Sequence, residues 1–250
     1  MRLAQEVPVP RTIGRPYEEF VYRLAGKWYY LPEPHIVEAP FFETLLARRT
    51  RRTFGPVDEE HLSALLWFTA KTLATRSGAV PQPYRADVHS HWEHRATPSA
   101  GGRHPIDVVV MCPSVAGVGV LSVYDPISHA LGPLEPADAL SLTNLSEAMR
   151  NVMPPEDGAI LWHVAQPQRT FSRYEAGESL VWRDAGCLVA TTALVAEALG
   201  LACCPLGITG GPELVRALGG AGRLAGVGGC IIGTRRMADV TAAGIVEPIP

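Results

Sequence analysis

The stretch DAGCLVATTALVAEALGLA, residues 184–202, is the longest apolar segment of helical character in the sequence. Asp184 is a residue type that favours a helix N-cap, and Gly200 is one that favours a helix C-terminus, so the stretch predicts a helix beginning at Asp184. Hydrophobic side chains cover nearly all of its faces. We therefore expect this helix in the centre of the fold or at a subunit interface.

The composition allows one large domain with a substantial core, because 47% of the 250 residues are hydrophobic. The formal net charge is -3, so no overall positive field draws the protein to nucleic acid or to an anionic membrane. The five cysteines lie in mostly apolar surroundings, which favours a reduced, cytoplasmic protein. The N-terminus lacks a signal peptide's apolar run, and no stretch approaches ~18 uninterrupted apolar residues, so we expect neither secretion nor a membrane span.

Residues 1–41 are rich in proline and aromatic residues without a clear period, which predicts an extended arm packed on a single domain formed by residues 42–250. The spacing of FETLLARR predicts a helix over residues 42–49. Acidic residues favour the first turn of a helix, so a second helix is predicted to begin at Asp58. Its expected buried stripe consists of Leu62, Leu65, Leu66 and Leu73.

The rest of the chain alternates strands and helices, which gives an α+β or α/β fold class. Residues 74–95 and 167–182 are polar, so both are predicted to be irregular connections. The predicted strands are 107–112, a hairpin over 118–135, 158–166, and a final strand that ends at Arg235 and Arg236. A helix is predicted from Pro136, and CCPLGITGGPELVRALGG predicts a loop followed by a short helix.

Four arginines crowd into ARRTRRTFG: Arg48, Arg49, Arg51 and Arg52. Guanidinium forks and threonine hydroxyls at the end of a helix are suitable donors for a phosphate. A solvated basic face would show the same pattern. Arg235 and Arg236 leave the same two alternatives, a second phosphate contact or exposure to water.

Two glycine-rich segments allow a backbone to approach another group closely. PSAGG, residues 98–102, precedes a predicted buried strand, and successive glycines without a Cβ let another strand or a ligand come near. CCPLGITGG offers backbone N–H groups beside the long helix, as a cradle for a flat, polar-edged ligand or as a helix end and turn. Cys203 and Cys204 in this segment are expected to be small buried residues, because adjacent cysteines lack the usual spacing of a redox pair.

Three histidines lie in HSHWEH, where His89 and His91 would share one face of a strand and His94 follows nearby. No acidic or cysteine ligand pattern completes a metal site. A polar loop is the interpretation that the residues favour, and we predict no metal.

The order ARRTRRTF, LSALLWFTAKTLATR, TPSAGGRHPIDVVV, VYDPISHAL and DAGCLVATTALVAEALGLACCPLG resembles the FMN-dependent nitroreductase superfamily, from about Phe42 to Arg235. Within it, the sequence is most similar to the SagB-type branch, the azoline dehydrogenases that oxidise thiazoline or oxazoline rings in modified peptides. The resemblance implies an α+β nitroreductase-like fold with a central mixed, mostly antiparallel sheet flanked by helices. It also implies an intertwined homodimer with two FMN sites.

The resemblance also implies roles for individual residues. Arg48, Arg49, Thr50 and Arg52 match the segment that holds the FMN phosphate, ribityl chain and pyrimidine edge. Pro98, Ser99, Ala100 and Gly101 match the turn that touches the flavin from the partner subunit. Pro205, Leu206 and Gly207 match the loop whose backbone N–H approaches flavin N5, and Arg235 matches a phosphate-binding basic residue.

Azoline dehydrogenases carry a Lys-Tyr pair where this sequence has Arg173 and Tyr174. An arginine stays protonated and cannot act as a general base. Tyr174 is therefore favoured as a packing or substrate-contacting residue, and it is also the candidate for the catalytic position. Three functions follow. The first is oxidation of a peptide or natural-product intermediate with an azoline-like ring, with O2 reoxidising the flavin. The second is a nitroreductase or quinone reductase with NAD(P)H as redox partner, and the third is a flavin-free peptide-binding scaffold.

Overall fold

The computed structural model describes residues 6–77, 91–112, 115 and 121–236 of the chain. The helices are α1 (Phe41–Ala47), α2 (Glu59–Ala70), the 3-10 turn η1 (Ala100–Gly102), α3 (Ala139–Val152), α4 (Pro167–Phe171), α5 (Glu178–Ala198) and α6 (Gly211–Ala217). The strands are β1 (Val9–Pro10), β2 (Tyr29–Tyr30), β3 (Thr72–Ser77), β4 (His91–Arg95), β5 (Ile106–Met111), β6 (Ser122–Asp125), β7 (Ala130–Pro133), β8 (Ala159–Ala165), β9 (Tyr174–Glu175), β10 (Leu201–Pro205) and β11 (Ala225–Thr234).

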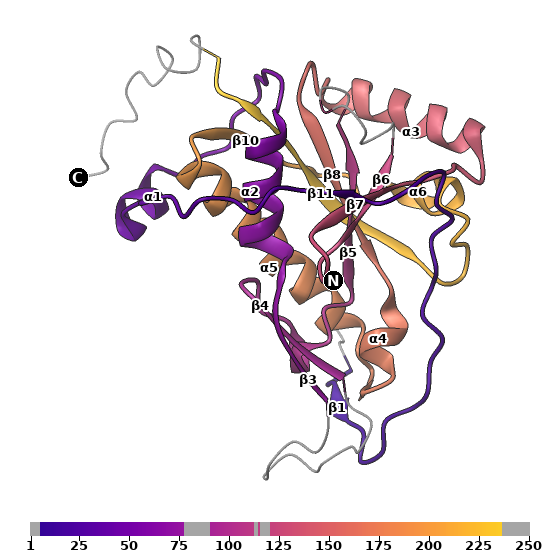
Figure 1. The fold of residues 1–250 in the computed structure, drawn as a ribbon. Helices are drawn as coiled ribbons and strands as arrows, with labels where there is room; N and C mark the ends of the chain where they lie inside the picture. Colours follow the sequence, from indigo (N-terminus) through magenta and orange to yellow (C-terminus); the bar gives the residue numbers. More distant parts are fainter. Residues whose placement is uncertain (1–5, 78–90, 113–114, 116–120, 237–250) are drawn as a thin grey trace.

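A seven-stranded sheet in the order β10-β11-β8-β5-β6-β7-β2 forms the centre of the fold (Figure 1). Every strand pairing among the described residues is antiparallel. The predicted α+β class, with a mostly antiparallel sheet flanked by helices, is confirmed. The homodimer is a property of two chains and stays a prediction.

The two faces of the sheet are covered by different helices, because successive side chains of a strand point to opposite faces. In β8, Leu161 joins the core that includes α2 and α5, whereas Trp162 joins the core that includes α3 and α6. Every residue of β8 is buried, as expected of a strand between two helical layers. Figure 1 shows α5 running across one of these faces.

Helix α5 begins at Glu178, after Gly177 at the N-cap position. The prediction that Asp184 caps this helix is therefore wrong, since Asp184 is a buried residue inside it. Residues 178–183 form the first turns of the helix, in which Val181 packs into the core and Trp182 is exposed. The predicted end is confirmed by Gly200, whose φ of 70° suits a glycine just beyond a helix. Among the described helices, α5 has the length and hydropathy to cross a membrane, and 44% of the apolar stretch is buried in the fold.

Both segments predicted to be irregular contain regular structure. Residues 74–95 include part of β3 and all of β4, which pair with each other as an antiparallel ribbon, while residues 78–90 lie outside the described residues. Polar residues lie on both faces of this ribbon, so the strands lack the alternation that would have predicted them. Leu73 lies in β3 and is 51% exposed, and it is not part of the buried stripe of α2. Residues 167–182 contain α4, β9 and the start of α5.

Smaller corrections concern the ends of elements. Helix α3 begins after Asp138, whose carboxylate accepts hydrogen bonds from the backbone N–H groups of Leu140 and Ser141, so Pro136 precedes the helix. The cysteines of CCPLGITGG lie in β10 and not in a loop, because they pair with β11. The predicted hairpin is confirmed as β6 and β7, although residues 118–120 lie outside the described residues.

The N-terminal segment touches the body at two short strands. β1 pairs with β9, and β2 pairs with the sheet edge at β7. Helix α1 follows at Phe41. The division of the chain into an arm of residues 1–41 and a domain of residues 42–250 stays a prediction.

His163 lies in β8, and both of its ring nitrogens are buried without a hydrogen-bond partner among the described residues. Burial lowers its pKa from 6.5 to about 4. Near pH 6.5 His163 therefore binds a proton in the unfolded chain but stays neutral in the folded chain. The folded state consequently loses stability as the pH falls from 6.5 towards 4. The slope for one such histidine is up to about 1.4 kcal/mol per pH unit.

We predict that His163→Leu reduces this pH dependence. His104 and His129 also have pKa values lowered to about 4 by burial and remain in the variant. The slope of unfolding free energy between pH 5 and 6.5 should therefore fall by about one third, measured by urea denaturation of both proteins. An unchanged slope would show that His163 is not buried in its neutral form.

Candidate cofactor site

The Pro98–Gly101 turn is held by a carboxylate of α5. Ser99 Oγ donates a hydrogen bond to Asp184 Oδ2 at 2.6 Å, and the backbone N–H of Ala100 donates to Asp184 Oδ1 at 3.0 Å. Burial raises the pKa of Asp184, while these hydrogen bonds oppose the rise. Asp184 is therefore the anchor of the turn and not a free acid.

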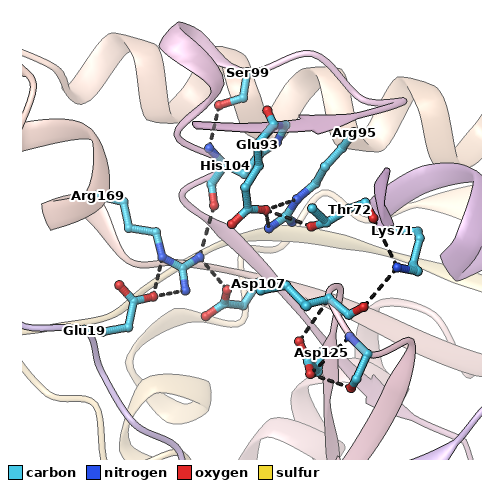
Figure 2. A network of polar contacts seen from close by, with 12 residues as sticks. Glu19, Lys71, Thr72, Glu93, Arg95, Ser99, His104, Asp107, Asp125 and Arg169 are labelled. Carbon is cyan, nitrogen blue, oxygen red and sulfur yellow. Dashed lines mark hydrogen bonds and ion pairs between the residues drawn. The ribbon is translucent and has the colours of Figure 1, made fainter. Parts of the chain in front are cut away.

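A polar network holds the other side of the turn, and Figure 2 shows its members. The backbone N–H of His104 donates to Ser99 Oγ at 2.9 Å. Arg169 donates to the backbone oxygen of His104 at 3.0 Å and to Asp107 at 2.6 Å, and it also contacts Glu19 of the N-terminal segment. These contacts connect the N-terminal segment, α4 and β5 to the predicted flavin-contacting turn.

Tyr174 lies directly against this turn. Gly101 has a φ of 61°, and a Cβ added to it would lie 2.7 Å from Tyr174 Oη. Tyr174 is half-buried and lies in β9, where it pairs with Pro10 of β1. The structure thus brings the catalytic candidate Tyr174 into contact with the Pro98–Gly101 turn, a proximity that sequence spacing did not reveal.

The arginine segment is held by a second carboxylate of α5. Glu197 forms a two-pronged ion pair with Arg51, in which Nη2 lies 3.2 Å from Oε1, and both side chains are buried. Arg235 also pairs with Glu197, at 2.8 Å. Arg235 therefore lies beside the arginine segment, but its guanidinium is engaged by a carboxylate as well as by the backbone oxygen of Leu201 at 3.2 Å.

The other members of the arginine segment face outward. Arg48, Arg49, Thr50 and Arg52 are all exposed. None of the arginines Arg48, Arg49 and Arg52 forms an ion pair within the part of the chain that the structure describes. Burial raises the pKa of the Cys204 thiol and the Arg52 guanidinium opposes that rise, so Arg52 reaches the β10 side of the site. The segment keeps three cationic side chains available for a ligand.

The Pro205–Gly207 segment follows β10. Leu206 donates its backbone N–H to Gly229 at 2.9 Å, so this donor is used within the protein. Gly207 is exposed, and a Cβ built on it meets no atom within 4 Å. Pro205 has no N–H. The N–H of Gly207 forms no hydrogen bond within the described residues and is therefore open to a ligand.

The two anchoring carboxylates lie far apart on α5. Asp184 and Glu197 are separated by thirteen positions, which is roughly 20 Å along a helix. The Pro98–Gly101 turn and the arginine segment are thus fixed at distant points of one chain.

Arg51 was grouped with the possible phosphate donors, but its guanidinium is engaged by Glu197, a residue that the predicted site did not include. The sequence contains one indication of this ion pair, because Glu197 is the only charged residue in residues 185–202. A carboxylate in so apolar a helix needs a cationic partner. Cys203 and Cys204 are buried and free, as predicted.

The histidine cluster is only partly described, since His89 lies outside the described residues. His94 stacks on Trp92 with ring centroids 6.2 Å apart. Among the described residues, no group of three or more His, Cys, Asp or Glu side chains could hold a metal ion.

A model of the nitroreductase family matches residues 45–234, which include the arginine segment, the Pro98–Gly101 turn and both carboxylates of α5. The chain belongs to the nitroreductase family. A search of curated protein sequences gives no significant match.

Solved structures of nitroreductase-family proteins share the fold. A Ralstonia eutropha protein named as a nitroreductase is 23% identical over 89% of this chain and 98% of its own, with a TM-score of 0.59. An Anabaena variabilis protein named in the same way is 19% identical over 78% of this chain and 38% of its own, with a TM-score of 0.56. The Escherichia coli microcin synthetase McbBCD complex, with truncated pro-MccB17 bound, contains a chain 16% identical over 88% of this chain and 79% of its own, with a TM-score of 0.54.

The contact between Gly101 and Tyr174 predicts the effect of a methyl group. Gly101→Ala places a Cβ in a left-handed conformation and against Tyr174 Oη, so it should lower stability by about 1–2 kcal/mol. Gly207→Ala, where the space is open, is the matched control and should change stability by less than about 1 kcal/mol. Thermal unfolding measures both, and adding Tyr174→Phe to Gly101→Ala should recover part of the loss. Equal stability of the two alanine variants would contradict the contact.

Glu197→Ala should be strongly destabilising, because it leaves the buried Arg51 without its carboxylate. Breaking a buried pair costs about 3–5 kcal/mol. The matched control is Glu213→Ala, which removes an exposed ion pair with Arg216 and should cost less than about 1 kcal/mol. Urea denaturation measures both losses, and similar values for the two variants would show that the Glu197 pair is not buried.

Proposed function

We propose that the chain is an FMN-dependent oxidoreductase that works as a homodimer. The observation that carries the proposal is the arginine segment, in which exposed Arg48, Arg49 and Arg52 surround a buried and fully paired Arg51. A solvated basic face does not need a buried ion pair to fix its backbone. A phosphate site does, because charge-assisted contacts require donors held in place.

The residues of the site fit FMN. The phosphate needs cationic donors without competing carboxylates, and Arg48, Arg49 and Arg52 meet that need. A flat ring system needs a wall without side chains and a backbone donor, and Gly207 offers both. Arg235 is engaged by Glu197, so its role is to position the arginine segment.

Bound FMN would supply the hydride chemistry, and the protein would supply position and protonation. The N–H of Gly207 can donate to the electron-rich edge of the ring. Arg173 cannot accept a proton, whereas the Tyr174 hydroxyl can donate or accept a hydrogen bond where it meets the turn. Tyr174 is accordingly proposed as the group that contacts the substrate.

The separation of the two anchors supports the homodimer. The turn held at Asp184 and the donors held at Glu197 are anchored roughly 20 Å apart along α5 of one chain, which favours a site that combines segments of two chains. Helix α1 packs near α5 and exposes Phe41, Phe42 and Leu46, which are 64%, 74% and 86% exposed. Such an apolar surface marks a protein interface. The second subunit would bring its own turn to the arginine segment of the first.

For the substrate, we propose a peptide or natural-product intermediate with an azoline-like ring. The structural neighbour from McbBCD supports this class, because that complex holds a truncated propeptide. We also propose a cytoplasmic location, because the five cysteines form no disulfide bond in the described part of the chain. The neighbours named as nitroreductases favour a second candidate, reduction of a nitroaromatic or quinone by NAD(P)H. Anaerobic mixing separates the two, since the flavin is bleached by an azoline peptide in the first case and by NADH or NADPH in the second.

FMN affinity tests the phosphate assignment. The double variant Arg48→Ala, Arg52→Ala should weaken FMN binding strongly, because each charge-assisted contact contributes about 1.5–3 kcal/mol. The control is Arg23→Ala, Lys27→Ala, which removes two positive charges from exposed positions of the N-terminal segment. Flavin fluorescence titration measures both dissociation constants. If both double variants bind FMN as tightly as the wild type, the phosphate is held elsewhere.

A further inference from the structure

A groove of about 890 Å³ lies between the N-terminal segment and the start of α5. Its lining includes Arg11, Arg15, Tyr174, Glu178 and Trp182. The volume is near the upper end of sites that hold small ligands, about 300–1,000 Å³. Except for Tyr174, the residues that line this groove have no assigned role in the predicted FMN site.

The N-terminal wall of the groove is firmly attached. Arg11 donates its backbone N–H to Arg173 at 2.8 Å, and its side chain pairs with Glu175 at 2.7 Å. Arg15 donates its backbone N–H to Ser172 at 2.7 Å. The wall therefore keeps its place beside Tyr174, and its side chains can act as recognition groups.

The groove offers charges of both signs and one aromatic surface. Arg15 is exposed and forms no ion pair within the described part of the chain, whereas Arg11 is neutralised by Glu175. Glu6 and Glu178 add carboxylates to the lining. Trp182 is 55% exposed and presents a large ring that the core does not use.

This lining matches a peptide better than a small anion or a flat neutral acceptor. A peptide offers N–H donors to Glu6 and Glu178, and an acidic side chain can pair with Arg15. A ring in the peptide can stack on Trp182. A nitroaromatic or quinone would leave most of these polar groups without partners.

One end of the groove lies at the proposed cofactor site. Tyr174 lines it and touches Gly101 of the turn assigned to the flavin. A peptide lying in the groove would therefore present a residue to Tyr174 at the edge of the proposed cofactor site.

We propose that this groove is the substrate-recognition site, in which Arg15 binds a carboxylate of the peptide and Trp182 stacks on its ring. The proposal rests on the oxidoreductase function above and extends it to the N-terminal segment, which becomes part of the substrate site. Arg15 and Trp182 act in binding and specificity, and neither is assigned to FMN.

Binding of a stable product analogue tests the proposal. The probe is a fluorescein-labelled hexapeptide with a central thiazole followed by aspartate, and a matched probe carries asparagine in place of the aspartate. Fluorescence anisotropy is measured with the FMN-treated full-length protein. Arg15→Gln should weaken binding of the aspartate probe by about fivefold and leave the asparagine probe unaffected. Trp182→Ala should weaken both probes by about fivefold to tenfold.

Arg23→Gln is the control, because Arg23 is an exposed arginine of the same segment that pairs with Glu135 outside the groove. It should bind both probes as the wild type does. Wild-type protein that fails to bind the aspartate probe, or equal binding by wild type, Arg15→Gln and Trp182→Ala, would overturn the proposal. Flavin content is read separately from absorbance, so protein that binds the probes without retaining FMN refutes the proposed oxidoreductase function and not the groove.

Discussion

A carboxylate buried in a protein must be paired, and α5 carries two of them, Asp184 and Glu197. Asp184 accepts hydrogen bonds from the Pro98–Gly101 turn, and Glu197 holds Arg51 and Arg235. The Pro98–Gly101 turn and the arginine segment have few apolar side chains with which to pack. Their positions depend on these polar contacts. The apolar helix that forms the core therefore also places the two segments to which the cofactor is assigned.

This arrangement favours the proposal that two chains share the site. Along α5 the two carboxylates are roughly 20 Å apart. In the proposed site, Tyr174 and Gly101 lie on the substrate side at one end of the helix, and the exposed arginines lie on the phosphate side at the other. We propose that a second subunit completes the site around one flavin, and the exposed apolar side chains of α1 offer a surface for it.

The sequence predicted what depends on local signals. Gly200 ends α5 because a glycine just past a helix tolerates a positive φ, and the arginine segment was recognisable from its residue types. Asp184 was wrongly predicted to cap the helix, because the true start at Glu178 depends on the packing of Val181. The β3–β4 ribbon was not predicted, because polar residues on both of its faces remove the alternation of apolar and polar side chains that indicates a strand. Contacts between distant segments, such as Tyr174 with Gly101 and Arg51 with Glu197, leave no periodic trace in a sequence.

Size-exclusion chromatography of FMN-treated protein, with light scattering and visible absorbance recorded on the same eluate, tests whether two chains share the cofactor site. A shared site predicts that flavin absorbance coincides with a particle of two chains carrying two FMN molecules, and that any monomer is colourless. A flavin-loaded monomer would contradict the shared site, and a colourless dimer would contradict the cofactor assignment.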